Sequence, residues 1–142
     1  MVEDDPDDVE LTLRAIQKNM IANDVFVAKN GVEALDFLFG EREHIDKIRP
    51  LTPSLVLLDI ILPNLDGFEV LRRMRGSERT RLIPVVILTS SREKLDLLKG
   101  YEPGANSYVR KPTDFGESLL TVQELGQYWL TLNEPVPSHR GK

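Results

Sequence analysis

The sequence contains no cysteine, which excludes disulfide frameworks, thiolate zinc sites and cysteine nucleophiles. Histidine is almost as scarce, because His44 and His139 are the only two, and neither has companions at the spacing of a metal site. We therefore expect both histidines to lie in a surface loop and in the tail. A Gly-rich phosphate loop is also absent, which excludes a nucleotide-binding P-loop.

Basic residues are outnumbered, with 18 Lys and Arg against 23 Asp and Glu, for a net charge of −5. This balance argues against nucleic-acid binding by bulk electrostatics, which requires a basic surface. The start of the chain lacks the basic segment of a secretory signal, and its apolar runs fall far short of the roughly 18 residues of a membrane helix. We expect a soluble cytoplasmic protein, and 142 residues fit a single domain.

Apolar residues recur in a pattern that predicts alternating helices and strands. Helical spacing predicts helices over residues 6–20, 31–39, 67–75, 92–99 and 115–132, with Asn30 as the cap of the second. Short β-prone runs predict strands over residues 24–28, 55–58, 84–88 and 107–109. The runs at 55–58 and 84–88 are apolar without alternation, which is typical of strands covered on both faces. The chain is therefore predicted to form a parallel sheet with helices on both faces.

The front of this sheet is short, because only Met1 and Val2 precede the first acidic residues. Two residues are fewer than a central strand ordinarily contains. Either the chain begins late relative to its natural start, or the first strand is a naturally short stub. We favour the shortened start, because the other elements are all present.

Polar side chains follow the strand ends, and in open parallel sheets ligands bind outside the carboxyl ends of the strands. These residues are Glu3 and Asp4 after the stub, then Asp59, Thr89 and Lys111 after the later strands. Three carboxylates in one crevice raise each other's pKa unless a cation joins them. Oxygen ligands without imidazole or thiolate select a hard divalent ion, and we expect Mg²⁺.

A Mg²⁺ ion with open coordination positions is suited to receive a phosphoryl group, whose charge Lys111 can neutralise and to which Thr89 can donate a hydrogen bond. An aspartate can itself be the nucleophile and form an acyl phosphate. Asp59 is the best candidate, because it ends the central apolar strand and leaves the two earlier acids free to bind the metal.

Four motifs in order resemble the receiver domain of two-component response regulators. They are Val2-Glu3-Asp4-Asp5, the run from Leu58 to Gly67, Leu88-Thr89-Ser90-Ser91, and the run from Gly104 to Pro112. The resemblance covers nearly the whole chain. It implies a flavodoxin-like, doubly wound, five-stranded parallel sheet in the order 2-1-3-4-5.

The same resemblance implies roles for individual residues. Asp59 is expected to be the phosphoacceptor and Lys111 the phosphate-pairing lysine. Thr89 and Tyr108 are expected to form the switch. The metal ligands are expected to be Glu3, Asp4, Asp59 and the backbone carbonyl of Ile61.

The helix opening at Pro6, the long loop before residue 55 and the ending at 128–135 are similar to single-domain regulators associated with phytochrome-type histidine kinases. This implies a receiver domain over residues 1–132 and a tail over 133–142 without an output domain. It also implies a sensor histidine kinase and a downstream protein target as partners. Pro103 departs from the family, which tends to have leucine there.

The leading interpretation is a stand-alone phosphoacceptor and not an enzyme, and the alternative is a dimerisation or interaction module of the same fold that does not phosphorylate. An aspartyl-phosphate hydrolase would need an acid at the position of Ile61. An electron carrier of the flavodoxin type would need a Ser/Thr-rich loop where Glu3 and Asp4 stand.

The last predicted helix carries Tyr128 and Trp129 side by side, about 100° apart around its axis, so both cannot face one core. Trp129 shares an apolar stripe with Val122 and Leu125. We therefore expect Tyr128 to face outward and to contribute to a homodimer.

Overall fold

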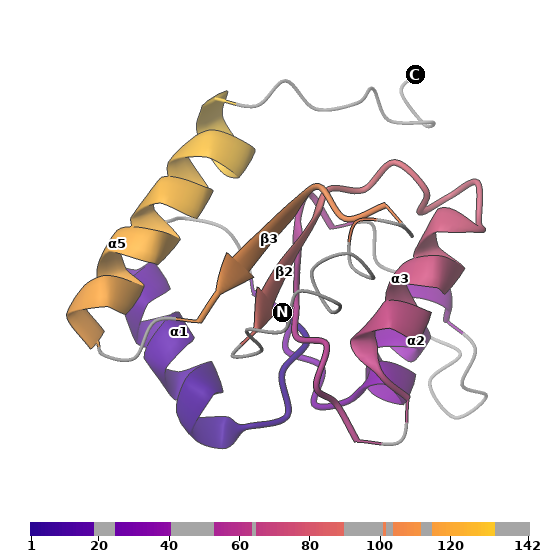
Figure 1. Ribbon diagram of the computed structural model, residues 1–142, viewed down its shortest axis with the longest axis horizontal. Coiled ribbons are helices and arrows are strands. Elements are labelled where there is room, and N and C mark those ends of the chain that lie inside the picture. The colour runs from indigo at the N-terminus through magenta and orange to yellow at the C-terminus, as the bar shows by residue number, and fades with distance from the viewer. Residues whose placement is uncertain are drawn as a thin grey trace.

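Helices lie on both sides of a parallel sheet in the computed structural model (Figure 1). The structure describes residues 1–18, 25–40, 53–63, 65–89, 101, 104–111 and 115–132. The helices are α1 (Pro6–Lys18), α2 (Gly31–Phe39), α3 (Gly67–Arg75) and α5 (Phe115–Gly126), which continues into a π-helical turn, η2 (Gln127–Leu132). The strands are β1 (Val56–Leu58), β2 (Val85–Thr89) and β3 (Ser107–Arg110). Helices α1 and α5 pack together on one side of the sheet, and α2 and α3 on the other. Within this described part, no helix combines the length and apolar character needed to span a bilayer.

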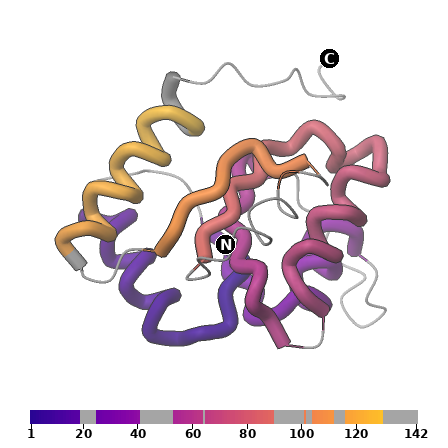
Figure 2. Tube along the Cα trace, in the orientation of Figure 1, coloured from indigo at the N-terminus to yellow at the C-terminus, as the bar shows by residue number. Residues whose placement is uncertain are grey.

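The sheet runs in the order β1-β2-β3, all parallel. Val2 extends it by single-residue parallel bridges to Leu58 on one side and to Ala28 on the other. Figure 2 shows the N-terminal end of the chain lying centrally, between the two pairs of helices. The order across the sheet is therefore residue 28, residue 2, β1, β2, β3. This arrangement confirms the predicted order 2-1-3-4-5, with a first strand reduced to one bridging residue.

The predicted strand at 24–28 is wrong in extent, because Ala28 is its single paired position within the described residues 25–28. This strand is short because its pairing partner is short. Of residues 1–3, only Val2 forms a bridge to it. The predicted helix at 92–99 lies outside the described residues, as do His44, His139, Pro103 and the tail at 133–142.

The core confirms that the central strands are covered on both faces. Every residue of β2 is buried, and Leu58 of β1 is fully buried. Against them α3 packs a stripe of fully buried residues, Val70, Leu71 and Met74. A rigid apolar layer of this kind fixes where the strand ends lie.

Helix caps set the entry of α2 and α3. The Asn30 side chain accepts a hydrogen bond from the Glu33 amide at 2.8 Å, which confirms the predicted cap. Asp66 caps α3 in the same way through the Glu69 amide, at 2.9 Å. The next residue, Gly67, comes so close to the end of β1 that its amide donates to the Ile60 carbonyl at 3.2 Å.

Arg75, in the last turn of α3, ties together the starts of β2 and β3. Its guanidinium donates to the carbonyls of Ile83 (2.8 Å) and Gly104 (2.9 Å) and to the side chain of Asn106 (2.9 Å). Asn106 Oδ1 also accepts a hydrogen bond from the Val85 amide at 2.8 Å. These contacts fix the amino ends of the strands and leave the opposite edge of the sheet to the polar residues described next.

Candidate metal and phosphoacceptor site

Three carboxylates meet just beyond the carboxyl ends of the stub and β1. Glu3 and Asp59 are buried, at 5% and 4% exposure, whereas Asp4 is exposed. Each offers an oxygen atom, and these atoms lie within 4.8 Å of one another. The Asp59 amide donates to the Val2 carbonyl at 3.0 Å, so the backbone pairing of the stub with β1 sets the carboxylates side by side.

Both carboxylate oxygens of Asp59 are oriented by neighbouring donors. Oδ1 accepts a hydrogen bond from the Ile61 amide at 3.0 Å, and Oδ2 accepts one from Lys111 Nζ at 2.8 Å. The Ile61 side chain is 57% exposed and points away from the core. The backbone amide of residue 61 therefore contacts Asp59, while its side chain lies at the surface. The role of the Ile61 carbonyl as a metal ligand stays a prediction.

Lys111 places its ammonium among three carboxylates. Nζ lies 2.6 Å from Glu3 Oε1, 2.8 Å from Asp59 Oδ2 and 2.8 Å from Asp8 Oδ2. The Lys111 amide donates to the Thr89 carbonyl at 2.7 Å, which ties the lysine to the end of β2. The structure thus brings together residues that the sequence separates by more than a hundred positions.

The charges at the site do not balance. Burial is the largest influence on the pKa of Glu3 and raises it to about 7, opposed by the hydrogen bond from Lys111 and reinforced by the charge of Asp59. Burial alone would lower the pKa of Lys111, but the hydrogen bonds to Asp59, Asp8 and Glu3 outweigh it and raise this pKa above its ordinary value. One ammonium therefore faces an excess of carboxylates, a field that attracts a further cation.

The donor set fits Mg²⁺. Glu3, Asp4 and Asp59 supply oxygen ligands alone, which is the chemistry of a hard divalent ion. The pKa of Glu3 is raised mainly by burial and further by the charge of Asp59, and a bound cation would oppose both influences. These three side chains would hold the ion, as the sequence predicts.

The remaining predicted residues lie on neighbouring strands. Thr89 ends β2, is fully buried and is paired in register with Arg110. Tyr108 lies in β3, packs against the core and has its ring 6.4 Å from that of Tyr101. Thr89 therefore shares the edge of the sheet with Asp59 and Lys111, and Tyr108 lies further back along β3.

Asp8 is the site residue that the sequence analysis missed. It belongs to the first turn of α1, and because a helix that follows a strand begins at the strand's carboxyl end, that turn faces the crevice. Its position four residues after Asp4 was the available signal. Acidic residues are so frequent in first turns of helices that this signal is weak.

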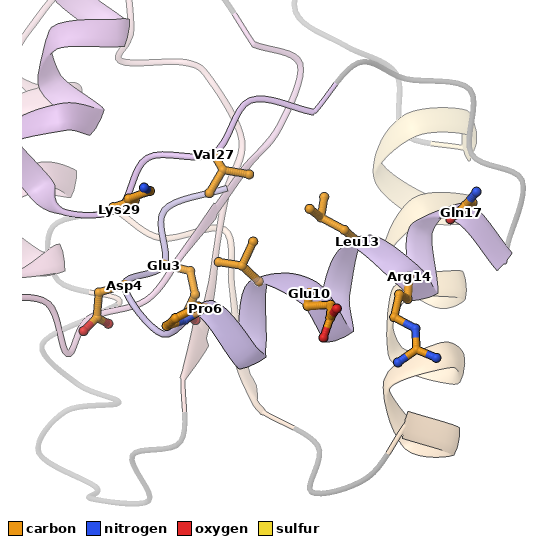
Figure 3. Close-up of a pocket in the computed structure, with 10 residues that line it drawn as sticks. Glu3, Asp4, Pro6, Glu10, Leu13, Arg14, Gln17, Val27 and Lys29 are labelled. Carbon is orange, nitrogen blue, oxygen red and sulfur yellow. The ribbon is translucent and has the colours of Figure 1, made fainter.

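A pocket of about 420 Å³ opens beside Asp4, between α1 and the segment around Val27 (Figure 3). It extends along α1 from Asp4 to Gln17. Its lining is apolar at Pro6, Val9, Leu13 and Val27 and charged at Glu10, Arg14 and Lys29. Glu3 and Asp4 also line this pocket, so it overlaps the acidic cluster at these two residues.

Comparison with known proteins gives concordant matches. The family model for the response regulator receiver domain matches residues 1–123. The probable methanogenesis regulatory protein FilR2 of Methanothrix harundinacea is 41% identical over 139 residues, 97% of this chain and 87% of its own length. Two solved structures are similar: the Mn²⁺-bound form of response regulator Rcp1 (TM-score 0.84, 30% identity, 95% of each chain) and the bacteriophytochrome response regulator AtBRR (TM-score 0.72, 48% identity, 94% of each chain). The predicted flavodoxin-like receiver fold is thereby confirmed.

Proposed function

Because the chain belongs to the response regulator receiver family, we propose that it is a stand-alone regulator that accepts a phosphoryl group from a sensor histidine kinase on Asp59. The observation that carries this proposal is the pairing of Asp59 Oδ2 with Lys111 Nζ at 2.8 Å beside carboxylates that fit Mg²⁺. Receiver domains are signalling proteins and not enzymes, so the output is a change in protein contacts.

The transfer step follows from the placement of Asp59. One carboxylate oxygen attacks the phosphorus of a phosphohistidine, the phosphorus–nitrogen bond breaks, and the histidine leaves with that electron pair. The Ile61 amide and Lys111 hold the two oxygens of Asp59 in place. Mg²⁺, held by Glu3, Asp4, Asp59 and the Ile61 carbonyl, would supply charge neutralisation for the phosphoryl group. The Mn²⁺-bound state of Rcp1 supports this cofactor assignment.

Thr89 and Tyr108 are proposed as the switch. Thr89 is fully buried at the end of β2, and its carbonyl already accepts the Lys111 amide. Its hydroxyl would donate to the phosphoryl group, and the strand ends would shift with it. Tyr108, which packs against the core from β3, would follow that shift and change the surface read by the downstream target.

The similarity to AtBRR supports a phytochrome-type kinase as the donor. We assign residues 1–132 to the receiver domain and 133–142 to a tail, and we place the protein in the cytoplasm, where a kinase would present its phosphohistidine. The alternative function is a module of the same fold that binds partners without phosphorylation.

Mass spectrometry of the intact protein separates these two functions. After incubation with phosphoramidate and Mg²⁺, the wild-type chain is expected to gain one phosphoryl mass, and the Asp59→Asn variant none. Chelation of Mg²⁺ is expected to abolish the gain. A wild-type protein that binds Mg²⁺ and stays at its original mass would favour the non-phosphorylating module.

A homodimer through the end of α5 is a further part of the proposal. Tyr128 is 51% exposed and its ring packs edge-on against Trp129, with centroids 4.9 Å apart, which supports the outward position predicted for it. Tyr128→Glu is expected to shift a dimer to monomer in sedimentation, because it places a charge in an apolar contact. Gln127→Glu, at an exposed neighbour on the same turn, is the matched control. A dimer unaffected by Tyr128→Glu would exclude this surface.

A further inference from the structure

Asp8 contacts the site without belonging to its metal-binding set. Its Oδ2 lies 2.8 Å from Lys111 Nζ, and the Asp8 side chain is about one-third exposed. The group that can share a cation consists of Glu3, Asp4 and Asp59, and Asp8 is not part of it. Asp8 is thus bound to the lysine and separate from the metal ligands.

The other two carboxylate partners of Lys111 have a competing use. Glu3 and Asp59 hold the ammonium at 2.6 and 2.8 Å, and both also belong to the group of carboxylates that fits a divalent cation. A doubly charged ion would draw on these same two carboxylates and would repel the ammonium across a few ångströms of a largely buried site. Lys111 would therefore lose part of its contact with Glu3 and Asp59 when the metal binds.

We propose that Asp8 is a positioning residue that anchors the Lys111 ammonium beside Asp59 while Glu3 and Asp59 bind Mg²⁺. The inference rests on the proposed function, because it assigns the lysine a task in phosphoryl transfer. Without Asp8 the ammonium either competes with the metal for Glu3 and Asp59 or turns away from the phosphoacceptor. Both consequences act against phosphorylation.

The neighbouring Asp7 provides a matched control. It lies in the same first turn of α1 and carries the same charge, but its side chain is exposed, and its amide donates to Asp5 Oδ1 at 2.9 Å. Asp7→Asn therefore measures the effect of one negative charge near the site. Asp8→Asn measures that charge together with the contact to Lys111.

The experiment uses the full chain, with Mg²⁺ affinity from calorimetry and the rate of phosphoryl gain from phosphoramidate. Asp8→Asn is expected to weaken Mg²⁺ binding by about threefold to tenfold and to slow phosphorylation at saturating Mg²⁺ by about tenfold, the scale of one charge-assisted hydrogen bond. Asp7→Asn is expected to change both by less than about twofold, the range of an exposed charge. Asp8→Glu is expected to restore most of the rate.

A double-mutant cycle with Lys111→Met identifies the route of the effect. In that background Asp8→Asn should affect Mg²⁺ binding no more than Asp7→Asn does, because the contact is already gone. An effect of Asp8→Asn on Mg²⁺ binding that is equal with and without Lys111 would overturn the proposal. If the wild-type chain takes up no phosphoryl group, the proposed function fails, and the Mg²⁺ cycle still decides whether Asp8 acts through Lys111.

Discussion

Replacing Lys111 by methionine is expected to lower the free energy of unfolding of the metal-free protein by about 3–5 kcal/mol, the range for removing one partner of a buried ion pair. Methionine keeps most of the length of the side chain and removes its charge. Glu3 and Asp59 then remain buried at about one-twentieth exposure without the ammonium that now bridges them. The loss comes from their desolvation and mutual repulsion.

Urea unfolding with and without Mg²⁺ tests this expectation. The ion should recover much of the lost stability, because it binds the folded state and supplies the missing positive charge. We also expect the variant to bind Mg²⁺ more tightly than the wild type, since no ammonium competes for the ligands. Lys18→Met, at an exposed position of α1, controls for the change in net charge. Equal stability of the Lys111 variant and the wild type in chelator would show that the ammonium is not what neutralises the site.

The same substitution should separate phosphorylation from signalling. The carboxylates and the metal remain, so Asp59 is still expected to take up a phosphoryl group, although more slowly. The charge pairing that would draw Thr89 and Tyr108 inward is lost, and the phosphorylated variant should bind its target no better than the unphosphorylated one.

Gly67→Ala is expected to destabilise the protein by about 3 kcal/mol, at the upper end of the range for overpacking. A Cβ atom at this position would lie 2.7 Å from Ile60 Cα and closer still to the Asp59 carbonyl oxygen. Both obstacles are backbone atoms, which cannot rotate away as the end of a side chain can. The start of α3 would have to move away from the backbone of Asp59 and Ile60.

Gly76→Ala is the matched control for this clash. Gly76 ends the same helix with φ −84° and ψ −6°, and its Cβ would meet the Arg72 carbonyl at 3.4 Å. Alanine should therefore be neutral or stabilise by about 0.5 kcal/mol through the unfolded state. The expectation is contradicted if Gly67→Ala unfolds in urea at the midpoint of the wild type. In that case α3 can shift to accommodate the methyl group, and the close approach at Ile60 does not contribute to the free energy of unfolding.

Features determined by neighbouring residues were predictable from the sequence. The Asn30 cap and the start of α1 at Pro6 each depend on side chains within one helical turn. Unbroken apolar runs predict the buried strands β1 and β2. Asp59, Glu3 and Lys111 were predictable because each directly follows a strand, and parallel strands end at a common edge.

Features determined by distant partners were not predictable. The contact of Asp8 with Lys111 spans 103 positions, and the bond from Arg75 to Asn106 spans 31. The overprediction of the strand at 24–28 has the same origin, because strand length depends on the partner and not on β propensity alone. The π-helical turn η2 and the pocket along α1 also lack a local sequence pattern comparable to a helix cap or an unbroken apolar run.

The single bridging residue Val2 also sets how the acidic edge can come apart. A few backbone hydrogen bonds join residues 1–3 to Ala28 and β1, so this segment can detach locally at a lower free energy than global unfolding, while β1, β2 and β3 stay paired. Glu3 and Asp4 would leave with it, and the metal-binding set would be dismantled within an otherwise intact sheet. A cation that binds only the attached segment would shift this local equilibrium, and would thereby hold in place the short segment that supplies two of its own ligands.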